Sequence, residues 1–415
     1  MSTGEVPRGY RDFMSLIARG HRPAFLILFA SFVLFGTSVT VIGAVLPRVL
    51  ADFAWDYLAA GSVIAAGSAG TFLAAYLAGR VIDRLGFRPA MVIGLVLDAA
   101  GLMVFAATAS VPLNAFVYFL IGAGQGFIEV AVNWSIVKMA PESSGRPMSL
   151  MHGAFSIGAV AGPIAAGAAI AAGIPWGVLY RVLGGCFLLL LATTFLVPGR
   201  GLEGAAAGSG AGRRAGLHGE PAFWLGSIVL MLYVGVEMGL SNWMGEFFVS
   251  ALGTTAASGA FAVSTFWMGL LAGRFGVPLL YKGPRHDRVL DVLGVILGVA
   301  TAALAVLGYC GGAAAAFLFS AVAGFGCSCV YPLSMSLVGE AFPEAQGEAM
   351  GFASAGGGLG SLLFPLGLAC VAKSWGIRAG YLALVPLAFS VLGTGLLLSS
   401  AIHRRSRRML DADEG

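Results

Sequence analysis

Three polar residues at helical spacing are the part of this sequence best suited to bind a solute. Gln125, Glu129 and Asn133 stand four residues apart, so on a helix they share one face, with Trp134 beside it. Amides and a carboxylate can hydrogen-bond the hydroxyls of a sugar, an indole can pack against its ring, and a buried carboxyl can also take up a proton. The stripe predicts a solute site with Glu129 as the carrier of a coupling ion. A structural hydrogen-bond cluster between helices is the alternative.

A second polar face has the same spacing. Tyr233, Glu237 and Ser241 lie four residues apart, and Asn242 and Trp243 follow directly. Glycines interspersed among them make this segment easy to bend. We predict a mobile gate in which Glu237 takes part in ion coupling and the other four contact the solute. A structural role for Glu237 is the alternative.

Three further residues carry polar groups into apolar segments. His152 can bond Glu129 or Asn133 across two helices, or it can simply be a packing histidine. Tyr331 can add a solute contact. Asp98 falls in the middle of an apolar segment, where a carboxylate is costly and marks either a site or a buried structural bond.

The elements that hold these residues are long apolar segments. The chain is 58% hydrophobic and only 11% charged, less than half the charge of a typical soluble domain. About 20 apolar residues in a helix cross the hydrocarbon core of a bilayer, and a spanning segment must be helical because lipid offers its backbone no partner. We predict an all-α polytopic membrane protein with twelve spans, at 24–45, 57–78, 89–109, 113–139, 147–172, 176–197, 222–247, 259–280, 289–308, 313–339, 347–372 and 380–402.

The basic residues predict the orientation. If both termini are cytoplasmic, 20 of the 24 Lys and Arg residues fall on the cytoplasmic side, Arg274 among them. The other side keeps Arg48, Arg181, Lys373 and Arg378. This distribution indicates the cytoplasmic membrane as the location, and it explains the net charge of +4 without a nucleic-acid partner. The first 20 residues lack the long apolar core of a cleavable signal peptide.

Several function classes lack their residues in this sequence. There is no phosphate-binding P-loop, no nucleophile triad and no metal-ligand spacing. The five cysteines all fall in predicted spans and are expected to be free. We therefore expect no enzyme activity, no cofactor and no metal. The expected partners are a small-molecule solute and the lipid bilayer, with the chain acting as a monomer.

The chain contains an internal repeat. Seven Gly, Pro and Glu residues recur in the second half at a constant separation of 202 positions. The pairs are Gly122 with Gly324, Gly124 with Gly326, Pro141 with Pro343, Glu142 with Glu344, Gly145 with Gly347, Gly158 with Gly360 and Pro163 with Pro365. We predict two pseudo-symmetric six-helix bundles, at 23–197 and 221–402. A linker at 198–220 joins them, and tails at 1–22 and 403–415 flank them.

The segment from Ala78 to Pro89, AGRVIDRLGFRP, closely resembles the loop signature G-x-x-x-D-R-x-G-x-R of the major facilitator superfamily. The matching residues are Gly79, Asp83, Arg84, Gly86 and Arg88. The resemblance implies that this loop is a conformational latch, and that the halves rock about a central site near mid-membrane. The second half has a degenerate copy at Gly273–Gly276.

A narrower resemblance concerns substrate. The runs GFIEVAVNWSIVKMAPE, MHGAFSIGAVAGP and YVGVEMGLSNWMGEFF look like the fucose/glucose/galactose:proton symporter family. It implies hexose or deoxyhexose symport with Glu129 as the proton carrier and Asn133 as a sugar ligand. That family's acid in the first helix is missing here, which leaves Na⁺ coupling or uniport open.

Another motif leaves a different substrate open. Gly158–Gly167, GAVAGPIAAG, also resembles a signature of drug:proton antiporters. A proton-coupled multidrug or lipid exporter is therefore the alternative function. The polar stripe on Gln125, Glu129 and Asn133 favours a hydrophilic solute over a lipophilic cation.

Overall fold

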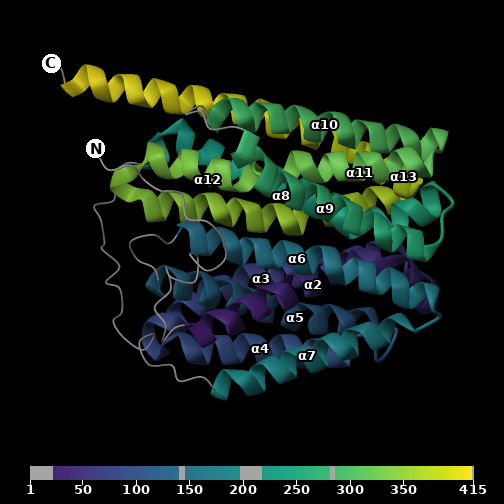
Figure 1. Cartoon of the computed structure of the whole chain (residues 1–415). Coiled ribbons are helices and arrows are strands. Elements are labelled where there is room, and N and C mark those ends of the chain that lie inside the picture. Colours follow the sequence, from purple (N-terminus) through teal and green to yellow (C-terminus); the bar gives the residue numbers. More distant parts are fainter. Residues whose placement is uncertain (1–21, 140–144, 197–216, 281–285, 414–415) are drawn as a thin grey trace.

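The computed structural model describes residues 22–139, 145–196, 217–280 and 286–413. Figure 1 shows its long helices running side by side. The elements are α2 (Arg22–Phe53), α3 (Tyr57–Leu85), α4 (Phe87–Val104), α5 (Val111–Met139), α6 (Gly145–Ala171), α7 (Trp176–Leu196), η2 (Leu217–Gly219), α8 (Pro221–Glu246), η3 (Phe247–Ala251), α9 (Ala256–Leu280), α10 (His286–Cys310), α11 (Ala313–Cys327), α12 (Val330–Ala341), η4 (Pro343–Ala345) and α13 (Gln346–Asp413).

Within the described ranges, eleven helical stretches are long and apolar enough to cross a membrane. The last one runs over 58 residues, Glu348–Arg405, about twice what one crossing needs. It is two helices joined at Gly376, whose φ of +81° no α-helix contains. The stretches thus hold the twelve predicted spans. The final helix continues to Asp413, beyond the predicted end at residue 402.

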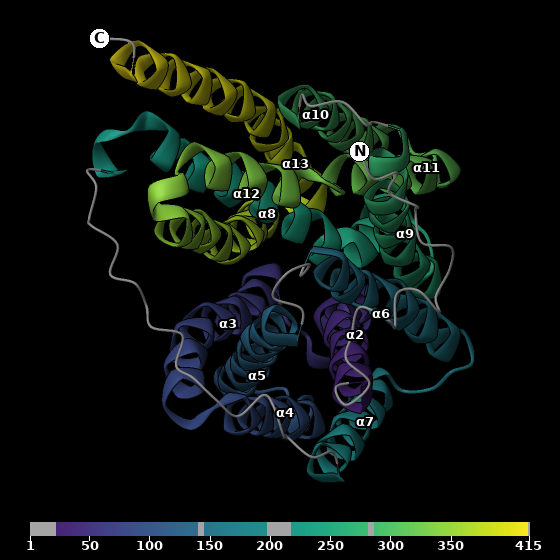
Figure 2. The same ribbon diagram turned by 60° about the vertical axis from the view of Figure 1, so that its left-hand side comes forward.

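The helices form two groups, α2–α7 and α8–α13, visible as the lower and upper bundles of Figure 2. Matching glycines pack each bundle in the same way. A Cβ atom added to Gly158 of α6 would lie 1.8 Å from a carbonyl oxygen of α2, and one added to Gly360 of α13 would lie 1.9 Å from a carbonyl oxygen of α8. Gly122 and Gly324 meet α3 and α9 just as closely. The halves are therefore pseudo-symmetric. Pro141 and Glu142 lie outside the described residues.

Two prolines, Pro332 and Pro365, interrupt the regular hydrogen bonds of their helices. Because Pro332 has no N–H, the carbonyl oxygen of Ser328, four residues earlier, has no helical partner. The predicted span 313–339 is accordingly divided at Ser328 into α11 and α12. Pro365 frees Ser361 in the same way, and the hydroxyl of Ser68 on α3 donates to that carbonyl oxygen at 3.1 Å. This bond joins the two halves.

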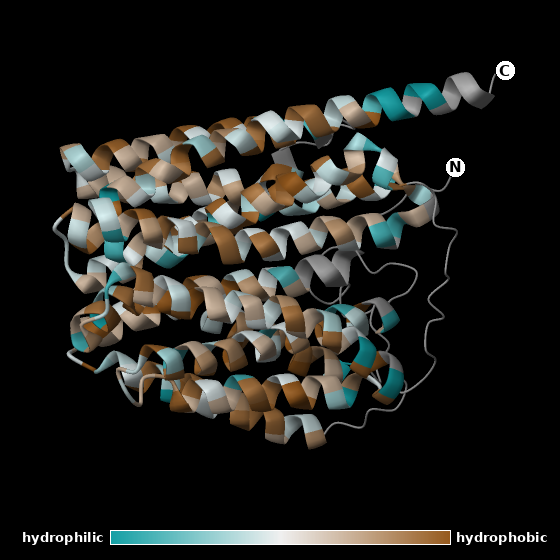
Figure 3. Cartoon of the chain, turned by 180° about the vertical axis from the view of Figure 1, so that it is seen from behind, coloured by the Kyte–Doolittle hydropathy of each residue, from teal (hydrophilic) through white to brown (hydrophobic). Residues whose placement is uncertain are grey.

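The outer surface of the bundle suits lipid. Large apolar side chains such as Tyr76, Leu189 and Leu318 are more than 60% exposed, and Figure 3 shows apolar residues distributed along the whole length of the bundle. Exposed apolar surface on this scale is stable only in a bilayer. The final turns of α13 are hydrophilic, where Arg405 and Arg408 pair with Glu220 at 3.5 and 3.3 Å.

Candidate solute site

The two ends of the bundle are distinct. The terminal end carries the start of α2, the start of α8 and the end of α13, which lie at the same end of the bundle in Figure 1. The hairpin end carries the short α2–α3, α4–α5 and α8–α9 connections. The predicted solute residues lie between these ends, on α5 and α6 of one half and on α8 and α12 of the other.

The α5 stripe splits in two. Gln125 is buried, and its Nε2 donates to the Ser38 hydroxyl at 2.9 Å, so it faces the interior of its own half. Glu129 and Asn133 are half-buried. The Oδ1 atom of Asn133 is buried without a hydrogen-bond partner. A buried oxygen atom without a hydrogen bond is energetically unfavourable, and it can accept a hydrogen bond from a solute hydroxyl. Trp134 is half-buried too, with the Lys138 ammonium 5.5 Å from its ring centre.

Tyr331 connects this stripe to the other half. Its hydroxyl shares a hydrogen bond of 3.1 Å with the hydroxyl of Ser354 on α13. It lies within electrostatic range of both Glu129 and Glu237. Both predicted ion-coupling carboxyls, one from each half, thus act on Tyr331 electrostatically without a hydrogen bond to it.

Glu237 lies deeper in the second half. It is buried and shares a face with Tyr233, whose buried hydroxyl makes no hydrogen bond. Arg274 of α9 lies within electrostatic range of Glu237 without a direct ion pair. The Tyr233 hydroxyl, one turn from Glu237, is close enough to the carboxyl to interact with it.

Arg274 is the functional candidate that the sequence analysis missed. The sequence analysis counts it only among the basic residues of the cytoplasmic side, although the predicted span 259–280 and the observed span Ala256–Pro278 both contain it. Its guanidinium reaches across to α6, donating to the Ser156 hydroxyl at 3.0 Å and to the His152 carbonyl oxygen at 3.4 Å. Its Nε also donates to Ser328, at the carbonyl that Pro332 frees. A charged residue within a span usually marks a site or pathway.

Of the two alternatives for His152, the structure shows the packing histidine. Its imidazole packs edge-on against Phe32, with ring centres 5.9 Å apart, and it has no hydrogen bond to Glu129 or Asn133. Its backbone carbonyl oxygen instead accepts a hydrogen bond from Arg274. In this conformation His152 therefore helps to join the halves through its backbone.

Ser241, Asn242 and Trp243 of α8 are engaged in packing in this conformation. The Ser241 hydroxyl accepts from Trp267 Nε1 at 2.8 Å, and the fully buried Trp243 donates to the Pro365 carbonyl oxygen at 3.2 Å. Asn242 packs closely against Gly43 of α2. These side chains become available to a solute only if the halves separate here.

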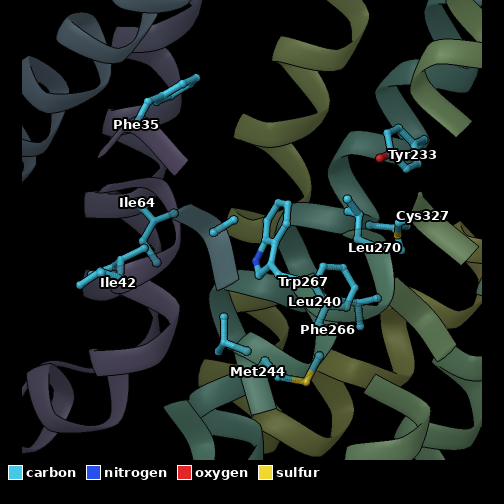
Figure 4. Packing of buried hydrophobic residues seen from close by; sticks show 14 of the residues in the cluster. Phe35, Ile42, Ile64, Tyr233, Leu240, Met244, Phe266, Trp267, Leu270 and Cys327 are labelled. Atoms are coloured by element: carbon cyan, nitrogen blue, oxygen red, sulfur yellow. The ribbon is translucent and has the colours of Figure 1, made fainter. Parts of the chain in front are cut away.

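An aromatic layer fills the middle of the interface. Figure 4 shows Trp267 between Phe35 of the first half and the buried cluster of the second half that includes Leu240 and Leu270. The ring of Trp267 is 5.7 Å from that of Phe155, which in turn is 5.1 Å from that of Phe35.

At the hairpin end the halves are closed. The Tyr57 hydroxyl of α3 donates to Glu246 of α8 at 2.9 Å, and Lys373 pairs with Asp56 at 3.0 Å. Nearer the terminal end, Phe72 of α3 lies against Gly358 of α13, and Arg274 of α9 donates to Ser156 and to the His152 carbonyl oxygen of α6. The bonds of Tyr57 and Lys373 thus close the hairpin end.

The predicted latch falls on the α3–α4 turn. Gly86 has a φ of +84°, and its N–H bonds the Ile82 carbonyl oxygen, so a residue without a Cβ is required there. Arg84 is exposed, and a Cβ atom added to Gly79 would meet nothing. Arg88 is half-buried, and the side chain of Asp83 lies outside the described residues. The degenerate copy Gly273–Gly276 is part of α9 rather than a loop.

The protein family to which the chain belongs follows from its sequence. The sequence model of the Major Facilitator Superfamily matches residues 28–320 and 285–409, nearly all of the membrane part. The chain belongs to the major facilitator superfamily. It is a multi-pass membrane protein, and its relatives and its fold are those of transporters.

Individual superfamily members are distant from it. Protein TsgA of Salmonella schwarzengrund is 24% identical over 346 residues, covering 81% of this chain and 84% of its own length. Myo-inositol transporter 2 of Cryptococcus neoformans is 32% identical over 155 residues, covering 37% of this chain and 28% of its own.

Solved structures of the superfamily share the fold. A D-xylose–proton symporter matches with a TM-score of 0.75 at 17% identity, covering 91% of this chain and 97% of its own. A variant of the nucleoside transporter NupG matches with a TM-score of 0.74 at 14% identity, covering 92% of this chain and 100% of its own. At these identities the likeness shows the architecture alone.

Proposed function

We propose that this protein is a secondary active transporter that moves a small hydroxylated solute, a hexose or deoxyhexose, by alternating access in symport with protons. The observation that carries the proposal is the set of polar groups left unfilled between the halves. These are the partnerless Asn133 Oδ1, the Glu129 carboxyl, and the Tyr331–Ser354 hydroxyl pair opposite them. They offer both donors and acceptors, as a polyol requires.

The relatives agree with this solute class. A myo-inositol transporter and a D-xylose–proton symporter are named for polyhydroxylated substrates, and a nucleoside carries a sugar ring. In the proposed cycle Glu129 binds a proton and the solute then binds beside it. The halves then rock so that the Tyr57–Glu246 contact opens or closes. Glu237 takes part through Tyr331.

The proposal also covers the orientation, the oligomeric state and the location of the protein. Both termini face the cytoplasm, and the protein works as a monomer in the cytoplasmic membrane. No organic cofactor or metal is needed, because the ion gradient supplies the free energy. Na⁺ in place of the proton is the competing choice of coupling ion.

The exporter alternative rested on Gly158–Gly167. In the structure Gly158 packs on α2, and Gly167 packs on Phe261 of α9. The equivalent Gly360 packs on α8 in the same way. Close helix packing therefore accounts for these glycines, and they carry no information on a lipophilic substrate.

The test is uptake by proteoliposomes that contain the purified protein. Radiolabelled D-glucose, D-galactose, L-fucose and D-xylose are offered with an imposed pH gradient, with a Na⁺ gradient, or with neither. We expect uphill accumulation of at least one sugar with the pH gradient. Glu129→Gln should abolish accumulation while leaving sugar counterflow, and Asn133→Ala should weaken both.

Two results would contradict the proposal. Uphill accumulation by Glu129→Gln would show that the coupling proton does not bind there. Transport of none of these sugars, together with export of lipophilic cations, would favour the exporter. Ser361→Ala is a matched control, because the Ser68 bond uses the backbone carbonyl of Ser361 and keeps it in this variant.

A further inference from the structure

Asp98 lies in the middle of α4, and its side chain has no exposed surface. Its Oδ1 accepts from the Ser38 hydroxyl of α2 at 3.3 Å, and Ser38 accepts in turn from Gln125 of α5. Its Oδ2 is buried with no hydrogen-bond partner. Among the described residues, the Ser38 hydroxyl is therefore the one hydrogen-bond partner of the Asp98 side chain.

The surroundings of Asp98 hold no compensating charge. The groups that face it are Ser38 from α2, Gln125 and Tyr118 from α5, and Tyr180 from α7 beyond Tyr118. Among the described residues no Lys, Arg or His interacts with it. An unpaired carboxylate costs several kcal/mol in such a place. These surroundings therefore favour the neutral, protonated carboxyl.

Packing alone does not require an acid here. A Cβ atom added to Gly124 would meet the backbone and Cβ of Asp98, and one added to the equivalent Gly326 would meet the same atoms of Leu297. The second half thus fills the matching position with leucine. The hydrogen-bonded carboxyl is a feature of the first half only.

From this geometry we propose that Asp98 is a second proton-binding site, connected to the solute face of α5 through Ser38 and Gln125. The proposal rests on the proposed function, because it assigns part of the proton coupling. Gln125 stands one turn before Glu129 on α5. Loss of the Asp98 proton would leave a carboxylate that demands a further donor at Oδ2, which would draw the Gln125 amide, now donating to Ser38, towards Asp98.

The same change would reach the interface between the halves. Ser38 stands on α2, which contacts α8 of the other half where Gly43 meets Ser241. A proton that binds one arrangement of α2 better than the other must shift the equilibrium between the two conformations. Asp98 is therefore placed to bias opening at the hairpin end.

Two measurements that need no solute test this proposal. The first is infrared titration of the purified protein in lipid, in the carbonyl-stretch region of protonated carboxyls. We expect a band at neutral pH that is absent in Asp98→Asn and displaced in Ser38→Ala. A band unchanged in Asp98→Asn would show that Asp98 is not protonated, and the proposal would fall.

The second is the distance between spin labels at the hairpin end. Labels at Ala107→Cys and Ala314→Cys, both exposed and in different halves, are introduced after the five native cysteines are replaced. A Glu129→Gln background removes the other proposed carrier of this half. Between about pH 5.5 and about pH 8 we expect the closed-to-open ratio to change by about fivefold or more.

The matched variants are Asp98→Asn, which keeps the shape, and Asp98→Leu, which copies the second half. Both should reduce the change in the closed-to-open ratio to less than about twofold. That is below the range of about 5–150-fold that is typical of coupling between sites. A full response in either variant would overturn the coupling role. Failure of sugar uptake would overturn only the proposed function, because neither measurement contains a sugar.

Discussion

Removal of one hydroxyl at the hairpin end should shift the transporter between its conformations. Tyr57→Phe removes the donor of the 2.9 Å bond to Glu246 that joins α3 to α8. The phenyl ring keeps its edge-on contact with Trp243, whose ring centre is 5.7 Å away. The substitution therefore tests the hydroxyl alone.

The magnitude follows from the surroundings of the bond. Glu246 is only 5% exposed, and a hydrogen bond to a charged group contributes about 1.5–3 kcal/mol. Glu246 keeps the Ser250 hydroxyl as a second donor, so the loss lies towards the low end. A loss of about 1.5 kcal/mol corresponds to a population shift of roughly tenfold.

The neighbouring ion pair provides the control. The side chains of Lys373 and Asp56 are 48% and 51% exposed, and an ion pair in such a position contributes about 0–1 kcal/mol. Lys373→Met should therefore open the hairpin end by at most about fivefold, since 1.4 kcal/mol is needed for a tenfold change.

The assay is the distance between labels at residues 107 and 314, measured at one pH in lipid. Tyr57→Phe should increase the population with separated labels more than Lys373→Met does. An unchanged distribution in Tyr57→Phe would refute the reasoning, and so would equal shifts in the two variants. In either case closure would depend on the α2–α8 backbone contact instead.

Two further predictions concern packing and pH. Gly158→Leu and Gly360→Leu should each abolish the folded, monodisperse protein, because an added Cβ atom would lie 1.8 or 1.9 Å from a backbone oxygen. Gly367→Leu, where a Cβ meets nothing, should fold normally by size-exclusion chromatography. The Ala59 N–H and then Lys373 lower the pKa of Asp56 from its usual 3.8. Its stabilisation is therefore present above that pH and lost only as pH falls through the lower folded value. Asp56→Asn should thus leave the shape of the pH response between about pH 5 and about pH 8 unchanged, and an altered midpoint in the label distances would contradict this.

The spans and the repeat could be predicted because both depend on local composition. A bilayer demands long apolar helices, so hydropathy alone finds them. Gly122, Gly158 and their counterparts recur because both halves need backbone contact at the same depth. The division at Ser328 was missed, although Pro332 marks it, because a proline within a transmembrane helix is often tolerated.

The solute site could be predicted only in part. The spacing of Glu129 and Asn133 places them on one face, but Gln125 turns inward because Ser38 of another helix accepts its hydrogen bond. No pattern within one helix contains that information. Arg274 falls within the predicted span 259–280 but was counted only towards orientation, because the positive-inside rule sorts basic residues by side and does not measure depth.

The ionisable residues break the pseudo-symmetry that the glycines keep. Gly70 of α3 and Gly269 of α9 pack on equivalent carbonyl oxygens, at 2.1 and 1.9 Å from an added Cβ. Counting five residues onward from each places Ala75 opposite Arg274, just as leucine stands opposite Asp98 in α4 and α10. Each half therefore has an ionisable residue where its counterpart is apolar. Helix packing accounts for the glycines that match between the halves. Residues that couple proton binding to conformational change should therefore be sought at the positions that differ.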